Sequence, residues 1–207
     1  MSSQVKVHVI STAMIGQEEI HIVKTRFPKR YNKAEALANH DDFLRSIGAS
    51  YLLTQAFSKI DEDEIKYNEH GKPYCDDKFF NISHEGGYSV LAVADSPVGV
   101  DICSQKRNNP DVAMKVFTQD EQFICSKFTG MFAKLWSQKE AVIKLLGEGL
   151  YRDIKSFSVS SFDRDKPIML DEKMIFCKTV DFNDYFISVC SYEDISIKVL
   201  DSVDFLF

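Results

Sequence analysis

The first apolar pattern along the chain has the two-residue period of a β-strand. Val5, Val7 and Val9 alternate with Lys6 and His8. This alternation is typical of a strand that is buried on one face only. We therefore expect residues 5–10 to form a strand within a sheet.

A basic segment and a helical pattern follow. Residues 24–33 contain Arg26, Lys29, Arg30 and Lys33 around a Phe-Pro step. From residue 34 to residue 57 the apolar positions recur at spacings of three and four, which is the period of one helix face. These positions are Leu44, Ile47, Tyr51, Leu52 and Ala56. The pattern predicts a helix over residues 34–57.

Two more helices are predicted in the second half of the chain. Thr118 is followed three residues later by Glu121, which is the spacing of a capping box and indicates a helix start. Residues 132–146 have the apolar period of another helix, and Gly147 follows the last apolar position. A glycine there is typical of a helix C-terminus.

Strand patterns fill much of the remaining chain. Residues 79–84, 88–94 and 98–102 are separated by short turn signals and predict a β-meander. Further β-rich stretches occupy residues 156–160, 174–180, 185–190 and 195–200, with a hairpin loop expected at 181–184. Strands and helices do not alternate regularly. The predicted fold class is therefore α+β rather than a doubly wound parallel sheet.

Composition and charge narrow the class of protein. The chain has 207 residues, of which 44% are hydrophobic and 27% charged, and its net charge is −6. This length fits one large domain or two compact halves. The negative charge gives no general attraction to nucleic acid. No apolar run reaches the roughly 18 residues that span a bilayer, and the N-terminus does not resemble a secretory signal. We expect a cytoplasmic protein that binds neither nucleic acid nor membrane.

The five cysteines form no C-x-x-C pair. An odd number without that spacing argues against a disulfide framework and against a structural zinc site. We expect reduced thiols that lie mostly in the core.

Charged residues interrupt the apolar face of the predicted helix 132–146. Lys139 projects from the centre of that face, where its ammonium must reach past its neighbours or pair with an anion. Glu140 and Lys144 lie one turn apart at the edge of the same face and can point into a cleft between helix and sheet. The alternative is an ordinary Glu-Lys helix pair.

Polar residues also occur in two of the predicted strands. Asp101 lies among residues that favour burial, and a buried carboxylate needs a partner, either a hydrogen-bonding loop or a metal ion. Ser83 and His84 end another strand just before a Gly-Gly turn, where backbone N–H groups and an imidazole could hold phosphate oxygens. Neighbouring strand residues point to opposite faces, so we do not expect a Ser-His nucleophile pair.

Five motifs in order resemble those of the 4′-phosphopantetheinyl transferases, and most closely the large, pseudo-dimeric type that activates surfactin synthetase. The motifs are Gly71-Lys72-Pro73, Phe80-Asn81-Ile82-Ser83-His84, Val98-Gly99-Val100-Asp101-Ile102, Phe117 with Glu121, and Trp136-Ser137-Gln138-Lys139-Glu140-Ala141 followed by Lys144 and Gly147-Glu148-Gly149-Leu150. Residues 26–46 resemble the basic N-terminal helix of that type more loosely.

The resemblance implies two similar α+β halves, each a small antiparallel sheet packed on a long helix. Residues 1–102 would carry the coenzyme A-binding elements and residues 103–207 the catalytic helix. A monomer of this kind binds coenzyme A between its halves. It transfers the phosphopantetheine arm to a serine of an apo acyl or peptidyl carrier protein and releases 3′,5′-ADP. Because the nucleophile belongs to the carrier, no Ser-His-Asp constellation is expected.

The resemblance also assigns roles to individual residues. Asp101 and Glu140 would hold Mg²⁺ against the pyrophosphate, since that ion prefers hard oxygen ligands. Glu140, directly or through a metal-bound water, would take the proton of the carrier serine. Lys144 would neutralise or protonate the leaving phosphate, with Lys139 and Glu121 completing the catalytic set. The residues expected to bind the nucleotide and its 3′-phosphate are Lys72, Pro73, Ser83, His84, Arg30, Lys33, Arg45 and Ser46.

One position departs from the family pattern. Many members have Glu two residues after the aspartate, where this chain has Cys103. A neutral thiol is a poor Mg²⁺ ligand. Either water fills the position or activity has been lost, and the presence of Asp101, Glu121, Lys139, Glu140 and Lys144 together favours water. The alternative function is a non-catalytic coenzyme A or carrier-protein binding module. An unrelated phosphoryl-transfer enzyme is not supported, because the chain has no G-x-x-x-x-G-K-[ST] loop.

Overall fold

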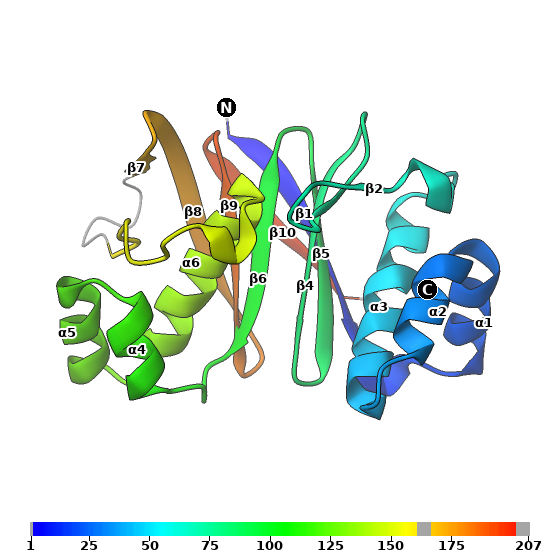
Figure 1. Ribbon diagram of the computed structural model, residues 1–207, viewed down its shortest axis with the longest axis horizontal. Helices are drawn as coiled ribbons and strands as arrows, with labels where there is room; N and C mark the ends of the chain where they lie inside the picture. Colours follow the sequence, from blue (N-terminus) through cyan, green and yellow to red (C-terminus); the bar gives the residue numbers. More distant parts are fainter. Residues whose placement is uncertain (1, 161–166, 202–207) are drawn as a thin grey trace.

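The computed structural model describes residues 2–160 and 167–201 (Figure 1). The first half of the chain contains a long strand, three helices and a set of short strands. Its elements are β1 (Ser3–Ser11), η1 (Thr12–Met14), α1 (Gln17–Arg26), α2 (Pro28–Glu35), α3 (His40–Ala56), η2 (Glu62–Glu64), β2 (Lys66–Tyr67), β3 (Pro73–Tyr74), β4 (Phe79–Glu85) and β5 (Tyr88–Ala94).

The second half also combines strands with three helices, but its helices differ in length and position. Its elements are β6 (Val98–Ser104), α4 (Pro110–Val116), α5 (Gln119–Lys127), α6 (Met131–Leu146), η3 (Gly149–Tyr151), β7 (Ile168–Leu170), β8 (Lys173–Phe182), β9 (Tyr185–Ser191) and β10 (Ile195–Asp201). No helix in the two described ranges is long and apolar enough to cross a membrane.

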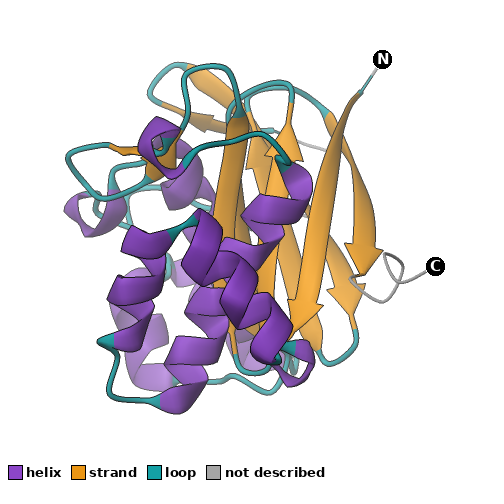
Figure 2. Ribbon diagram, turned by 90° about the vertical axis from the view of Figure 1, so that its right-hand side faces the viewer, coloured by secondary structure: helices purple, strands orange, loops and turns teal. Residues whose placement is uncertain are grey.

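Two four-stranded sheets form the centre of the molecule, in the orders β10-β1-β5-β4 and β6-β9-β8-β7. Figure 1 shows α1–α3 and α4–α6 flanking the strands on opposite sides, and Figure 2 shows the helices gathered toward one side of the strands. One apolar core lies under α1–α3 and a second under α6. A third core joins the two sheets and includes Val7, Val100 and Val189.

The two halves repeat one topology. In the first, a strand (β1) leads through a long helix (α3) to a hairpin (β4, β5), and the order in the sheet is β1-β5-β4. In the second, β6 leads through α6 to the hairpin β8–β9, with the order β6-β9-β8. The predicted α+β fold is confirmed. The last strand of the second half, β10, belongs to the sheet of the first half, where it pairs in parallel with β1. Sheet pairing does not test the predicted division after residue 102.

The predicted meander is wrong in its pairing although its strands are correct. β4 and β5 form a hairpin, but β6 pairs with β9 instead of β5. The turn at 95–97 therefore leads from one sheet to the other. Local sequence pattern could not show this, because strand pairing is decided by the core between the sheets.

The helix predicted over residues 34–57 is two helices. α2 ends at Glu35, and Asn39 caps the start of α3 by accepting hydrogen bonds from the backbone N–H groups of Asp41 and Asp42 at 2.7 and 3.3 Å. The capping side chain outweighs the apolar period across the break. Helix α1 was not predicted, and residues 156–160 form no strand. The helices predicted at Thr118 and over 132–146 are confirmed.

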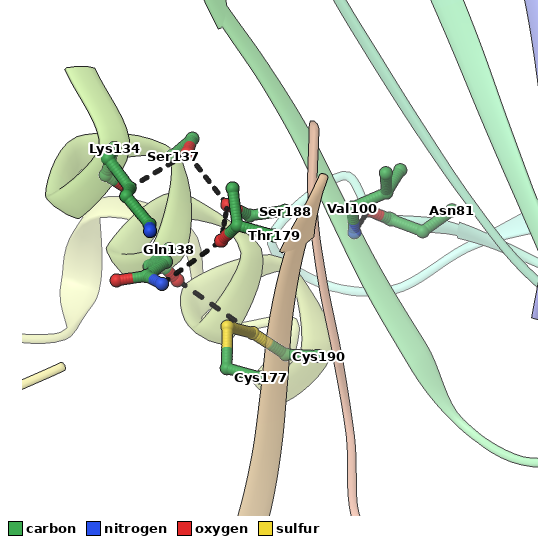
Figure 3. Close-up of a disulfide and its surroundings, with 9 residues drawn as sticks. All are labelled: Asn81, Val100, Lys134, Ser137, Gln138, Cys177, Thr179, Ser188 and Cys190. Atoms are coloured by element: carbon green, nitrogen blue, oxygen red, sulfur yellow. Dashed lines mark hydrogen bonds between the residues drawn. A yellow bond between two sulfur atoms is a disulfide. The ribbon is translucent and has the colours of Figure 1, made fainter. Parts of the chain in front are cut away.

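The expectation of reduced cysteines is wrong for one pair. Cys177 of β8 and Cys190 of β9 are direct partners in the antiparallel register and form a disulfide. Figure 3 shows it beside Gln138 of α6, whose carbonyl oxygen lies 3.8 Å from the sulfur of Cys190. Cys75, Cys103 and Cys125 are free. Neighbouring strands bring two cysteines together at any sequence separation, so the missing C-x-x-C spacing did not exclude this bond.

The side chains of β4, rather than its backbone groups, join this strand to β6. Alternate residues of β4 accept hydrogen bonds from alternate backbone N–H groups of β6. Asn81 accepts from Val100 at 2.9 Å, Ser83 from Ile102 at 3.4 Å and Glu85 from Ser104 at 2.8 Å. Figure 3 shows Asn81 beside Val100. These contacts hold the facing edges of the two sheets together.

Strand β6 also passes very close to α6. A Cβ atom at Gly99 would lie 2.1 Å from the carbonyl oxygen of Ala141 and 2.4 Å from the backbone nitrogen of Leu145. Only glycine permits this approach. It brings Asp101, two residues further along β6, onto the side of α6 that carries Glu140 and Lys144.

Replacing Gly99 by Ala should therefore destabilise the protein. The added methyl group meets backbone atoms that cannot turn away, and overpacking of this kind costs about 1–3 kcal/mol or more. Urea unfolding measures the loss. Gly87→Ala is the control, because a Cβ there would meet only the Thr12 hydroxyl at 3.9 Å. Equal stability of the two variants would contradict the close β6–α6 packing.

Candidate functional site

Three polar side chains meet where β4, β6 and α6 come together. Asp101 is buried, and its Oδ1 accepts hydrogen bonds from the Ser83 hydroxyl at 2.7 Å and from the Lys144 ammonium at 2.6 Å. Lys144 also donates to Ser83 at 2.7 Å. Burial raises the pKa of Asp101, and the charge of Lys144 opposes that effect. The cluster combines residues from both halves of the chain, as the resemblance implies.

Glu140 adds a second carboxylate beside the cluster. It lies one helical turn before Lys144 and is partly buried. It accepts no hydrogen bond from any residue that the structure describes. Burial, and then repulsion by Asp101, raises the pKa of Glu140. Two neighbouring carboxylates of which one lacks a hydrogen-bond donor are chemically suited to a divalent cation with hard-oxygen preference.

This donor set is small. Within the described ranges no group of three or more His, Cys, Asp or Glu side chains is arranged to hold a metal ion by itself. The two carboxylates therefore fit Mg²⁺ only if further oxygen ligands come from a phosphorylated substrate or from water, which is how Mg²⁺ is commonly bound.

Cys103 lies two residues after Asp101 on β6 and is fully buried. Burial, and then the negative charge of Glu85, raises the pKa of its thiol to about 12. The group is therefore a neutral thiol at physiological pH and a poor ligand for Mg²⁺.

The nucleotide-binding residues expected from the first half fall into two groups. Lys72, next to Pro73 of β3, reaches the end of α6, where its ammonium donates to the Leu145 carbonyl oxygen at 3.1 Å. Burial lowers the pKa of Lys72 to about 8. His84 and Arg45 lie near each other at the β4–β5 turn, where Arg45 donates to the Gly86 carbonyl oxygen at 2.8 Å.

The other three residues expected to bind the nucleotide, Arg30, Lys33 and Ser46, do not lie at the cluster. Arg30 donates to the Ser50 hydroxyl and to the Tyr67 hydroxyl, each at 2.9 Å, and so links α2 to α3 and β2. Lys33 is exposed. Ser46 makes its hydrogen bond through its backbone oxygen, which accepts from Ser50. For these three residues a role in nucleotide binding stays a prediction.

Lys139 and Glu121 form a separate buried pair. Both side chains are fully buried, and the ammonium lies 3.1 Å from the carboxylate. Lys139 also donates to the carbonyl oxygens of Ile154 at 2.8 Å and Phe157 at 2.5 Å. Glu121 accepts from the Val159 backbone N–H at 2.7 Å. These contacts tie the 154–159 segment to α5 and α6. The catalytic roles of Lys139 and Glu121 stay predictions.

Sequence analysis did not identify a second ion pair at the cluster. Arg107 donates to Glu85 at 2.6 Å, and its guanidinium lies 5.0 Å from the ring centroid of Trp136. The two-residue alternation of Asn81, Ser83 and Glu85 in β4 could have shown that Glu85 shares a face with Ser83. Nothing in the sequence placed Arg107, since it follows β6 in a loop.

Comparison with known proteins points to the same family as the sequence motifs. The model of the 4′-phosphopantetheinyl transferase superfamily matches residues 97–190, a range that includes Asp101, Glu140 and Lys144. A 4′-phosphopantetheinyl transferase of Bacillus subtilis is 31% identical over 194 residues, which is 85% of this chain and 86% of that protein.

Two further relatives match shorter ranges. The 4′-phosphopantetheinyl transferase Sfp of Bacillus subtilis strain 168 is 30% identical over 145 residues, covering 64% of this chain and 65% of that protein. The 4′-phosphopantetheinyl transferase gsp of Aneurinibacillus migulanus is 37% identical over 99 residues, covering 45% and 42% respectively.

The buried Lys139–Glu121 pair yields a prediction that separates structure from catalysis. Lys139→Met leaves the Glu121 carboxylate buried without a cation, and breaking such a pair costs about 3–5 kcal/mol. Adding Glu121→Gln should restore part of this, because an amide oxygen can still accept from Val159. Urea unfolding gives both values. A Lys139→Met protein as stable as the parent but unable to act on substrate would instead make Lys139 catalytic.

Proposed function

The chain belongs to the 4′-phosphopantetheinyl transferase superfamily, whose activity it shares, and from this premise we propose that the Ser83–Asp101–Lys144 cluster with Glu140 is its catalytic centre. The donor is coenzyme A and the acceptor is a serine of an apo acyl or peptidyl carrier protein. The observation that carries this proposal is the contact of Asp101 with both Ser83 and Lys144, because it joins a carboxylate and an ammonium from different elements at one partly buried junction.

The residues account for the transfer without a nucleophile of their own. The carrier serine oxygen bonds to the phosphorus that bears pantetheine while the phosphorus–oxygen bond to 3′,5′-ADP breaks. The Glu140 carboxylate receives the serine proton, and its raised pKa suits that role. Lys144 places its ammonium against the departing phosphate, which gains negative charge as the bond breaks.

Asp101 and Glu140 are the residues that would hold Mg²⁺. When bound, the ion would neutralise pyrophosphate charge and polarise the phosphoryl group. Asp101 meanwhile orients Lys144, since the two groups are 2.6 Å apart. Ser83 fixes the rotamer of Asp101 through its own hydrogen bond.

Lys72, His84 and Arg45 supply positive or hydrogen-bonding groups for the nucleotide. Partial burial, then the charges of Lys144 and Arg45, lowers the pKa of His84. A cationic neighbourhood that disfavours a further positive charge is one that attracts phosphate. That a single copy acts, and that it acts in the cytoplasm, stay predictions from the sequence.

Asp101→Asn and Glu140→Gln should each lower carrier modification by about 100-fold or more, because each removes electrostatic support for the developing charge. Mass spectrometry of several apo carrier proteins, incubated with the protein, coenzyme A and Mg²⁺, measures the added arm. Asp95→Asn, an exposed change in the turn before β6, is the matched control. Full activity of both test variants would remove the assignment of this cluster. Tight coenzyme A binding by the parent, with no carrier modified, would favour a binding module.

The lowered pKa of Lys72 predicts a pH dependence for nucleotide binding. Its ammonium is charged below a pKa of about 8 and loses its proton above it. Binding of 3′,5′-ADP should therefore weaken as the pH rises through 8, by up to about tenfold per pH unit. Calorimetric titrations at pH 7 and pH 9 test this. Lys72→Arg keeps its charge throughout and should flatten the dependence, whereas a flat profile in the parent would show that Lys72 does not meet the nucleotide.

A further inference from the structure

Arg107 occupies a defined position beside the proposed catalytic centre. It follows β6 in the loop that leads to α4, and its guanidinium is fixed on two sides. One N–H group donates to Glu85 at 2.6 Å, and the guanidinium lies over the Trp136 ring at 5.0 Å. Glu85 is itself held by the Ser104 backbone N–H at 2.8 Å. A cation held by an ion pair and an aromatic ring has little freedom left to lose on binding.

Its surroundings place this cation at the cluster. Trp136, Glu140 and Lys144 follow one another at four-residue spacing on α6, so they form one row along the helix. Arg107 stacks at the Trp136 end of that row, and Lys144 lies at the other end. The positive charge of Arg107 acts against the raised pKa of Cys103, two residues after Asp101 on β6. The positive charge of Arg107 also acts against the raised pKa of Glu140. Arg107 and Lys144 therefore lie on either side of Glu140.

Arg107 has unused hydrogen-bonding capacity. A guanidinium carries five N–H donors, and Glu85 takes one of them. The side chain is 42% exposed, so the remaining donors can reach a ligand. An arginine fork with free donors is well suited to phosphate oxygens.

We propose that Arg107 binds the phosphate of coenzyme A that carries pantetheine, opposite Lys144, and that Glu85 and Trp136 hold it in position for this. The inference rests on the proposed function. It assigns the two cations of the site to different parts of the pyrophosphate. Lys144 meets the phosphate that leaves with 3′,5′-ADP, and Arg107 meets the phosphate that is transferred. With Cys103 at its position on β6, the guanidinium meets no carboxylate from that residue.

Three ligands separate this assignment from any other role of Arg107, measured by calorimetry without a carrier protein. Arg107→Ala should raise the Kd of coenzyme A about tenfold or more, as expected for a charge-assisted bond to phosphate. It should raise the Kd of dephospho-coenzyme A by the same factor, because the 3′-phosphate is not involved. The Kd of 3′,5′-ADP, which lacks the pantetheine-bearing phosphate, should stay within about twofold of the parent value.

Lys106→Ala is the matched control. Lys106 is the preceding residue, carries the same charge and is 81% exposed, where it pairs with Asp184. Its removal should leave all three Kd values unchanged. Arg107→Lys, which keeps the charge but not the fork, should give an intermediate loss for coenzyme A. Circular dichroism checks that each variant is folded, and Arg107→Lys replaces Arg107→Ala if the latter is not.

The outcomes are distinct. If Arg107→Ala weakens 3′,5′-ADP as much as coenzyme A, Arg107 meets the nucleotide or acts through the fold, and the inference is overturned. It is also overturned if coenzyme A binds the variant as tightly as it binds the parent. Failure of the parent to modify any carrier would instead refute the proposed function, while the three binding constants would still decide where Arg107 acts.

Discussion

The close approach of β6 to α6 at Gly99 is the constraint on which the site depends. With any other residue at that position, a Cβ would lie 2.1 Å from the Ala141 carbonyl oxygen. Because the strand and helix touch there, Asp101 reaches Lys144 at 2.6 Å. Ser83 can join them only because β4 is fixed to β6 by side chains instead of backbone pairing. The cluster therefore exists only where the two halves meet.

The charges at this junction explain why it suits an anion with an accompanying cation. Asp101 and Glu140 are partly or fully buried and repel each other, which is unfavourable in the ligand-free protein. Lys144 offsets part of that repulsion. In the proposed function, a pyrophosphate together with a divalent ion would add partners for these charged groups, and its binding would relieve the unfavourable electrostatics. The deeply buried Lys139–Glu121 pair has no unpaired charge of this kind, because its two members neutralise each other.

The sequence predicted several local elements well and long-range pairing poorly, while the roles of the site residues stay predictions. The capping box at Thr118 and the apolar period of α6 were sufficient, because both signals are local. The placement of β6 in the second sheet, the Cys177–Cys190 bond and the position of Arg107 all depend on partners distant in sequence. The partner of Lys139 could not be identified from the sequence for a related reason. A lysine on an apolar helix face can serve a cleft or a buried partner, and only the fold brings Glu121 to it.

A crystal structure of the protein with coenzyme A and Mn²⁺ tests most directly whether the donor is bound where β4, β6 and α6 meet. Mn²⁺ accepts the same oxygen ligands as Mg²⁺ and can be located by its anomalous scattering. We predict an Mn²⁺ peak at the carboxylates of Asp101 and Glu140, with the pyrophosphate in contact with the Lys144 ammonium. Coenzyme A bound with its pyrophosphate away from Lys144, or bound there with Mn²⁺ held by other residues, would contradict it.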